Sequence, residues 1–140
     1  MRAVGVDLGT VRVGIAVSDE LGLLAHPRPH LDGRDRAALI GELCRLAAAE
    51  GIDLFVVGLP TRLDGRESAS TRRARSFAVA LAERSGKRVE LTDERWTTVE
   101  ARRRLREGGV RERQGRQRID SAAAAVLLQA WMDAHRVEAS

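Results

Sequence analysis

The fold class of this chain is decided by the stretch Val4-Gly5-Val6-Asp7-Leu8-Gly9-Thr10-Val11-Arg12-Val13-Gly14-Ile15-Ala16-Val17. Apolar residues alternate with small or polar ones before and after the Gly9-Thr10 turn, and this period of two predicts two strands joined as a hairpin. Asp7 lies inside the first strand, where a carboxylate is costly unless it is paired or bound to a cation. The stretch therefore predicts a sheet with a carboxylate built into it.

Strand and helix patterns alternate after the hairpin. Residues 24–31 predict a third strand, which Pro27 and Pro29 place at a sheet edge. A helix capped by Asp35 and ended by Gly51 comes next, followed by a buried parallel strand over 52–58. The next elements are a helix that carries Ala74, Phe77, Ala78 and Leu81 and a strand over 89–93. A helix opened by a Thr97/Glu100 capping box, a polar loop over 108–117 and a last helix complete the chain. The order β-β-β-α-β-α-β-α-α predicts an α/β fold, with a mixed five-stranded sheet and helices on both faces.

The last helix has the clearest apolar pattern in the chain. Its predicted buried face is the set Ile119, Ala122, Ala123, Val126, Leu127, Ala130 and Trp131. Small residues share a strand face with Asp7, and the alanine run over 122–125 suits close packing on that face. Asp120 lies at the start of the helix, so this packing would bring it close to Asp7.

The composition describes a chain that can build a core of its own. Its 140 residues are 44% hydrophobic and 31% charged, which fits one domain over residues 1–140 and excludes a disordered chain. No apolar run approaches the ~20 residues that span a membrane, and no secretory signal pattern follows Met1. The single cysteine, Cys44, excludes an internal disulfide and a cysteine-based zinc cluster. We therefore expect a cytoplasmic single domain.

Positive charge is concentrated in the middle of the chain. Residues 72–118 hold 15 basic and 7 acidic residues, whereas the net charge of the whole chain is only +4. A basic segment favours a polyanionic partner such as nucleic acid, although an arginine-rich solvated helix face gives the same pattern. The candidate phosphate-binding residues of this segment are Arg103, Arg104, Arg106, Arg111, Arg113, Arg116 and Arg118.

Three separated carboxylates converge in this predicted topology. Asp7, either Asp93 or Glu94, and Asp120 lie where the carboxyl ends of parallel strands meet, and ligands bind there in open α/β sheets. Such a cluster cannot stay fully ionised without a cation, and oxygen ligands alone select Mg²⁺ or Mn²⁺. Taken singly, Asp120 could be a helix cap and Asp93-Glu94 a solvated strand end. Taken together, the three favour a two-metal site that hydrolyses phosphodiester bonds.

Four motifs in this chain resemble those of the bacterial YqgF family, which is described as pre-16S rRNA nucleases or Holliday-junction-resolvase-like proteins. The first is the hairpin, which is similar to the family's Asp-x-Gly-x-x-Arg-(Ile/Val)-Gly. The others are Gly58-Leu59-Pro60 with Asp64-Gly65, Asp93-Glu94-Arg95-Trp96-Thr97-Thr98, and Ile119-Asp120-Ser121-Ala122-Ala123. Their order and spacing cover nearly the whole chain.

The resemblance implies an RNase H-like fold and a divalent-metal nuclease that uses Mg²⁺ or Mn²⁺. On the matched positions, Asp7, Glu94 and Asp120 are the catalytic and metal-binding triad. Arg12 and Arg95 lie within the motifs and join the candidate nucleic-acid-binding residues. The resemblance favours cleavage at the 5′ end of precursor 16S rRNA.

Other functions remain as alternatives. A resolvase of branched DNA must cut two strands symmetrically and so needs a stable dimer. No dimer helix is evident, and we expect a monomer, with a weak homodimer as the alternative. A third hypothesis is a non-catalytic nucleic-acid-binding module. A fourth is an ATP-binding protein, because Asp7-Leu8-Gly9-Thr10 resembles the phosphate-binding hairpin of actin-like ATPases and sugar kinases, although 140 residues supply only one of their two lobes.

Overall fold

The structure of the chain, a computed structural model, describes residues 1–60, 68–94 and 121–139. The turn at Asp64-Gly65, the helix predicted to open at Thr97 and the loop predicted over 108–117 lie outside these residues, as does Asp120.

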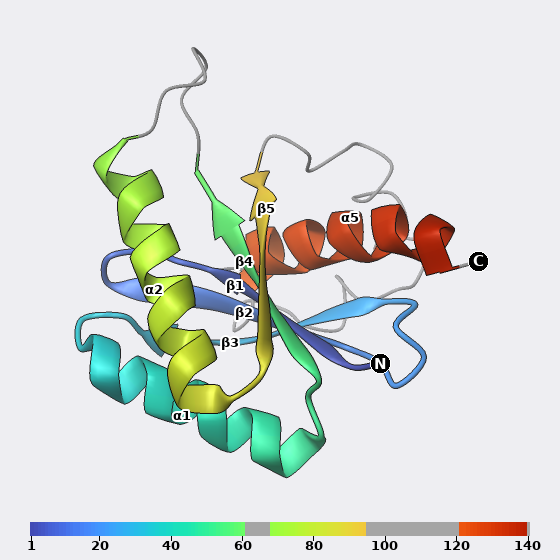
Figure 1. Cartoon of the computed structure of the whole chain (residues 1–140), viewed down its shortest axis with the longest axis horizontal. Helices are drawn as coiled ribbons and strands as arrows, with labels where there is room; N and C mark the ends of the chain where they lie inside the picture. Colours follow the sequence, from blue (N-terminus) through green and yellow to red (C-terminus); the bar gives the residue numbers. More distant parts are fainter. Residues whose placement is uncertain (61–67, 95–120, 140) are drawn as a thin grey trace.

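Five strands form one mixed sheet in the spatial order β3-β2-β1-β4-β5. They are β1 (Ala3–Asp7), β2 (Arg12–Ser18), β3 (Ala25–Asp32), β4 (Leu54–Leu59) and β5 (Arg88–Asp93). The β1–β2–β3 part is antiparallel, whereas β1, β4 and β5 run parallel, so that β4 and β5 point to the same end of the sheet in Figure 1. The predicted hairpin, the parallel strands and the edge position of the proline-bearing strand are confirmed.

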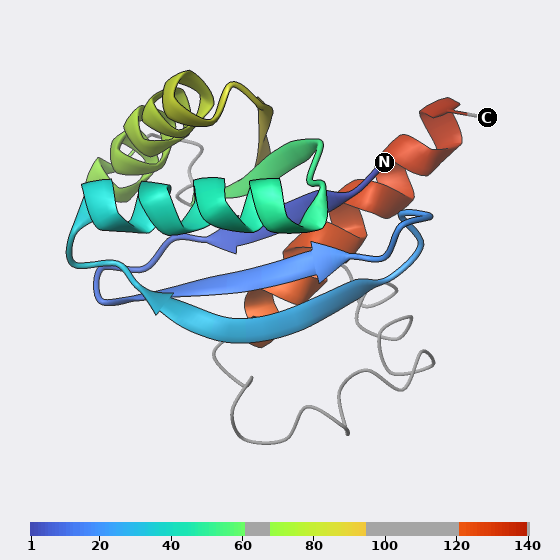
Figure 2. The same ribbon diagram turned by 90° about the horizontal axis from the view of Figure 1, so that it is seen from below.

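Helices cover both faces of the sheet, as predicted. Helices α1 (Arg36–Glu50) and α2 (Ala69–Ser85) lie on one face and α5 (Ala122–Ala139) on the other (Figure 2). The Asp35 carboxylate accepts a hydrogen bond from the Ala38 N–H at 3.2 Å and caps α1, and Gly51 ends this helix in the left-handed conformation with φ of 63°. None of the described helices has the length and apolar character needed to cross a membrane.

The alternation of side chains along the strands divides the core into two layers. Toward α1 and α2 the sheet presents large residues: Val4, Val6, Val13, Ile15, Phe55 and Val57. Toward α5 it presents smaller ones, with Ala3, Ala16 and Ala25 beside Leu54 and Val56. The difference in size lets α5 lie very close to the sheet. A Cβ on Gly5 would lie 2.7 Å from the Leu128 Cβ, so only glycine fits at that strand position.

The buried face of α5 is rotated relative to the predicted one. Leu127 and Trp131 are buried as expected, but Ala122 and Ala123 are exposed. The buried set is Ala124, Ala125, Leu127, Leu128, Gln129, Trp131 and Met132. Because residues 122–125 are all alanine, hydrophobic periodicity did not decide which two of them face the sheet.

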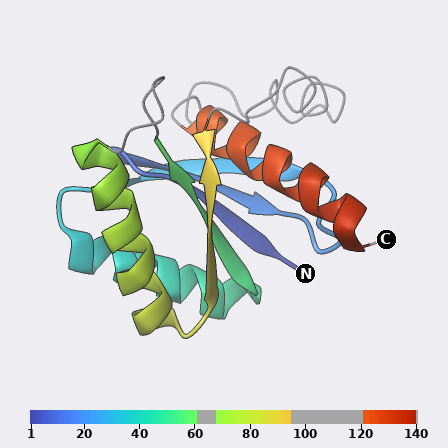
Figure 3. The ribbon, with the colours of Figure 1, turned by 45° about the horizontal axis from the view of Figure 1, so that its top comes forward.

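Two buried polar side chains fasten α5 to the β2–β3 hairpin. The Ser121 hydroxyl accepts a hydrogen bond from the Ile15 N–H at 3.0 Å, where the β2–β3 register is interrupted by a bulge. The Gln129 carbonyl accepts one from the Ala25 N–H at 3.0 Å, and its amide donates to the Leu23 carbonyl at 2.9 Å. The first two of these bonds satisfy the buried N–H groups of Ile15 and Ala25. The bonds of Ser121 and Gln129 fix α5 both along the sheet and in rotation. Figure 3 shows α5 on the face of the sheet away from α1 and α2.

Candidate active site at the carboxyl ends of the parallel strands

Asp7 is the last residue of the central strand β1. It pairs with Gly14 of β2, and side-chain alternation places it on the same face as Ala3 and Gly5, which is the face that α5 covers. The side chain is half-buried. Asp7 therefore lies at the carboxyl end of β1, on the face that the sequence predicted.

Glu94 reaches the same place from β5, two strands away. Gly58 of β4 pairs with Thr92, and Glu94 follows two residues later, so that both side chains belong to the face of Asp7. A Cβ on Gly58 would lie 2.8 Å from Glu94 Oε1 and 2.3 Å from Leu127 Cδ1. The missing side chain of Gly58 is therefore the space through which Glu94 passes over β4, and the Glu94 carboxyl forms a hydrogen bond with Asp7.

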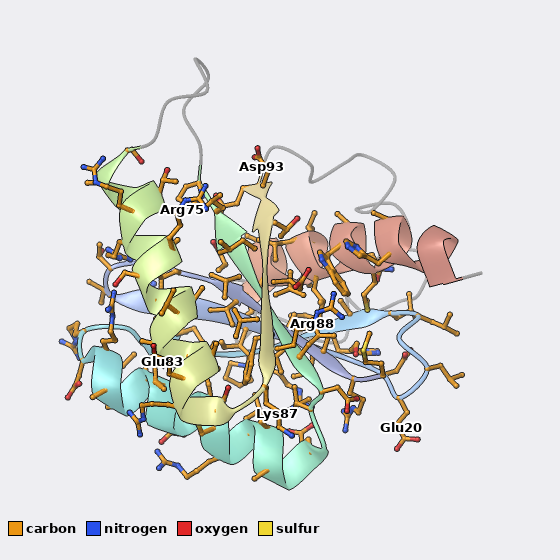
Figure 4. The ribbon with its side chains drawn as sticks, in the orientation of Figure 1. Glu20, Arg75, Glu83, Lys87, Arg88 and Asp93 are labelled. Atoms are coloured by element: carbon orange, nitrogen blue, oxygen red, sulfur yellow. The ribbon has the colours of Figure 1, made fainter. Side chains whose placement is uncertain are left out.

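The proximity of Asp7 and Glu94 affects the protonation of Glu94. The pKa of Glu94 is raised to about 7, first by burial and then by the hydrogen bond with Asp7 and the negative charges of Asp7 and Asp93. Near neutral pH, Glu94 is thus close to half-protonated in the metal-free protein. Figure 4 shows Asp93 at this same end of the sheet, at the tip of β5.

Glu50, at the opposite end of the sheet, has a lowered pKa instead. Arg28 donates to both oxygens of Glu50, at 2.7 and 2.9 Å, and Arg2 donates to it at 3.3 Å. The hydrogen bonds from Arg28, together with the charges of both arginines, lower the pKa of Glu50. Glu50 is therefore a structural ion-pair partner, whereas Glu94 is buried among carboxylates. Perturbation of the second kind is typical of functional sites.

The beginning of α5 is held beside the two carboxyl groups. Ser121 is buried and bonded to the Ile15 N–H, and Ile15 is next in the chain to Gly14, the pairing partner of Asp7. Asp120 is the residue before Ser121 in the chain and lies outside the described residues. The structure thus brings Asp7 and Glu94 together and places the chain neighbour of Asp120 within one residue of the Asp7–Gly14 pair.

The donor set fits a hard divalent cation. Within residues 1–60, 68–94 and 121–139, no three His, Cys, Asp or Glu side chains gather closely enough to hold a metal. Asp7 and Glu94 nevertheless form a pair of converging carboxyl groups, and burial together with the proximity of Asp7 makes the charged form of Glu94 unfavourable without a positive charge nearby. Oxygen donors in this state are those that Mg²⁺ and Mn²⁺ prefer.

Of the candidate arginines, the structure describes one. Arg12 is exposed at the start of β2, on the turn that follows Asp7, where it pairs in register with Asp32 of β3. The others lie outside the described residues: Arg95, Arg103, Arg104, Arg106, Arg111, Arg113, Arg116 and Arg118. Sequence reasoning missed the role of Gly58, although an isolated glycine inside an apolar strand indicates a close approach by another group.

Solved structures share this architecture. The RuvC of T. thermophilus in complex with a Holliday junction substrate superimposes with a TM-score of 0.65 at 15% identity, covering 98% of this chain and 96% of that one. The fowlpox virus Holliday junction resolvase gives a TM-score of 0.56 at 13% identity, covering 96% and 99% of the two chains. The fold is thus the RNase H-like fold of the RuvC-type nucleases, and the predicted fold class is confirmed.

Sequence relatives define the family more narrowly. The family model described as RuvX, Holliday junction resolvase, matches residues 1–134, and the chain belongs to this family, also called YqgF. A relative from Anaeromyxobacter sp. (strain Fw109-5) is 44% identical over 133 residues, covering 95% of this chain and 97% of its own. One from Myxococcus xanthus is 42% identical, covering 97% and 90%. Both are named pre-16S rRNA nuclease, so the predicted resemblance is confirmed.

Proposed function

We propose that this chain is a divalent-metal-dependent endonuclease that hydrolyses phosphodiester bonds at the 5′ end of precursor 16S rRNA. The observation that carries the proposal is the hydrogen-bonded pair of Asp7 and Glu94, which meets over Gly58 at the carboxyl ends of the parallel strands. The relatives' shared name, pre-16S rRNA nuclease, supports the choice of substrate. Maturation of rRNA would place the protein in the bacterial cytoplasm.

Asp7, Glu94 and Asp120 are the proposed catalytic and metal-binding residues. Asp120 joins the set because Ser121, its neighbour in the chain, is bonded beside the partner strand of Asp7. When Mg²⁺ or Mn²⁺ is bound, it supplies positive charge for the phosphoryl oxygens and lowers the pKa of the attacking water.

The protein's own residues prepare the site for that chemistry. Gly58 leaves room for Glu94 to reach Asp7. The closely packed α5 and the buried Thr92 beneath Glu94 exclude water from one side, which strengthens electrostatic interactions with the scissile phosphate. Ser121 holds the start of α5 against β2, and Asp120 is the residue before it in the chain. The arginines of the basic segment would bind the phosphate backbone of the substrate.

The test uses a 5′-extended 16S rRNA fragment with Mg²⁺ or Mn²⁺. Asp7→Asn and Glu94→Gln each remove a metal ligand and should lower the cleavage rate about 100-fold or more, because the metal is worth several kcal/mol in the transition state. Glu42→Gln is the matched control, because it also removes one carboxylate but lies on the exposed face of α1 beside Arg45. Cleavage by Asp7→Asn at the wild-type rate would contradict the mechanism.

The family description favours a second candidate, cleavage of branched DNA. A resolvase of this kind acts as a dimer with two sites on one junction. Competition between the rRNA fragment and a four-way DNA junction, combined with sedimentation of the protein on each, separates the two candidates. A monomer that cleaves the rRNA fragment and leaves the junction intact supports rRNA processing. Binding of either substrate without cleavage in both metals would instead indicate a non-catalytic module.

A further inference from the structure

A pocket that the proposed mechanism does not use lies at the same end of β1 as the candidate active site, on the opposite face of the sheet. It is a pocket of about 140 Å³ between the β1–β2 turn and the first halves of α1 and α2. The turn at the upper left of Figure 3 lies beside the start of α2. Leu8, Leu39 and Phe77 form its apolar floor, and Gly9, Thr10 and Gly33 supply backbone. Its remaining lining residues are all arginines: Arg34, Arg36 and Arg73.

The three arginines differ in how far their charge is already neutralised. Arg34 is held by Asp32 in a two-pronged ion pair, with Nη2 at 2.7 Å from Oδ2 and Nε at 3.0 Å from Oδ1. Arg36 donates instead to the neutral hydroxyl of Ser76 at 3.2 Å, which ties α1 to α2 without cancelling its charge. Arg73, one helical turn before Ser76, has no hydrogen-bond or ion-pair partner among the residues that the structure describes. Among the residues that the structure describes, two guanidinium groups without a carboxylate partner therefore line one small pocket.

The position of the pocket connects it to Asp7. Leu8 follows Asp7 in the chain and packs with the core on the α1–α2 side, whereas Asp7 belongs to the α5 side. The pocket and the carboxyl pair thus lie on opposite faces of the sheet, at the same end of β1. A nucleic-acid strand that crosses this end of the sheet would pass from one to the other.

We propose that the pocket of Arg36 and Arg73 binds a backbone phosphate of the nucleic-acid substrate, displaced along the strand from the bond that is cleaved; this inference rests on the proposed function. Guanidinium groups form paired hydrogen bonds with phosphate oxygens and keep their charge at every physiological pH. Among the described residues that line the pocket, there is no Asp or Glu side chain that would oppose an anion.

The test is a methylphosphonate scan of a labelled single-stranded RNA, in which one phosphate at a time is made neutral. Binding is measured in EDTA, so that cleavage does not interfere. For the wild-type protein, one position should weaken binding about tenfold, as expected for the loss of a charge-assisted contact. For Arg73→Ala and Arg36→Ala, a methylphosphonate at that same RNA position should not weaken binding further. Arg72→Ala is the matched control, because Arg72 is an exposed arginine on α2 that does not line the pocket.

The outcomes decide the proposal directly. Loss of the position-specific effect in the two pocket variants, and its retention in Arg72→Ala, supports a phosphate site. The proposal is overturned if one RNA position has the same effect in the wild type and all three variants, or if a methylphosphonate weakens binding equally at every position. Repeating the scan on a DNA strand of a four-way junction tells which nucleic acid uses the site. The scan measures binding and needs no catalysis, so it tests the phosphate site independently of cleavage. Failure of the wild-type protein to cleave would count against the proposed function only.

Discussion

The carboxylate of Glu94 occupies the space that a side chain on Gly58 would fill: a Cβ built on Gly58 would lie 2.8 Å from Glu94 Oε1. Asp7 and Glu94 are separated by the intervening strand β4, and neighbouring strands lie about 4.8 Å apart. The hydrogen bond between them therefore depends on the absence of a side chain at one position of β4.

Gly58→Ala should reduce activity more than it reduces stability. The new methyl group meets the ends of two flexible side chains, Glu94 and Leu127, and overpacking of this kind costs about 1–3 kcal/mol. The displaced Glu94 loses its contact with Asp7, so cleavage should fall about tenfold or more. Urea unfolding and single-turnover cleavage measure the two effects.

Two further variants separate packing from positioning. Gly58→Ala with Leu127→Ala makes room for the methyl group on the α5 side, and should recover part of any packing strain without restoring cleavage. Gly5→Ala is the matched control, because its Cβ meets the rigid Leu128 Cβ at 2.7 Å and the Ala124 carbonyl oxygen at 3.0 Å, away from Glu94. It should destabilise the fold more than Gly58→Ala does. Full activity of Gly58→Ala would show that Glu94 does not need this space.

The stability of the metal-free protein should fall between about pH 4.5 and pH 7. Burial, together with the nearby Asp7 and Asp93, raises the pKa of Glu94 from 4.5 to about 7, so the folded chain keeps a proton that the unfolded chain loses across this interval. The loss should be about 1–2 kcal/mol, because the group is only half-buried and solvent screens part of the interaction. Urea unfolding at several pH values measures it. Glu94→Gln should lack this decline and be the more stable protein above pH 7; equal slopes would refute the assignment.

Metal binding should release protons below neutral pH. A cation displaces the proton of Glu94, so close to one proton per bound ion should appear at pH 6 and almost none above about pH 8. Titration calorimetry with Mg²⁺ or Mn²⁺ in buffers of different ionisation enthalpy counts these protons. Glu94→Gln has no proton to release at this position, and its measured binding enthalpy should not depend on the buffer.

Local signals in the sequence predicted most of the fold. The Asp35 cap and the Gly51 end of α1 follow from the preferences of those residue types at helix ends, and the structure has both. The convergence of Asp7 with the end of β5 was predictable from the strand order alone. The residues by themselves did not decide whether Asp93 or Glu94 joins Asp7 in the candidate site. The β4–β5 register puts Glu94 on the face of Asp7, which no local pattern could specify.

The burial of Ser121 and Gln129 depends on long-range contacts, which local sequence patterns do not indicate. Ser121 and Gln129 are polar residues that the apolar periodicity of α5 treats as exposed, yet both are buried. Their partners lie more than a hundred residues earlier, at Ile15 and at Leu23 and Ala25. A buried polar residue is recognisable only once its partner is known. The rotation of α5 followed from these bonds, since alanines could face either side.

Gln129→Leu should therefore destabilise the protein more than an ordinary polar-to-apolar change in a helix. It leaves the buried Ala25 N–H without its acceptor and removes the part-buried hydrogen bond to the Leu23 carbonyl, which costs about 1–3 kcal/mol. Gln129→Glu keeps the acceptor for Ala25 but sets a carboxylate against the Leu23 carbonyl and Asp133, and its stability should recover on acidification. Chemical denaturation at pH 5 and pH 8 checks both. Equal stability of Gln129→Leu and the wild type would show that water replaces the amide.

The position of each carboxylate in the sheet also determines how it is exposed to local opening. Asp7 ends the central strand, which is hydrogen-bonded on both sides, whereas Glu94 follows the last strand, which has one neighbour in the described sheet. Amide hydrogens of β1 should exchange only on global unfolding, and those near the end of β5 through fraying that leaves the core intact. Such fraying would separate Glu94 from Asp7 at a small free-energy cost. The proposed catalytic site would then be lost and regained without global unfolding.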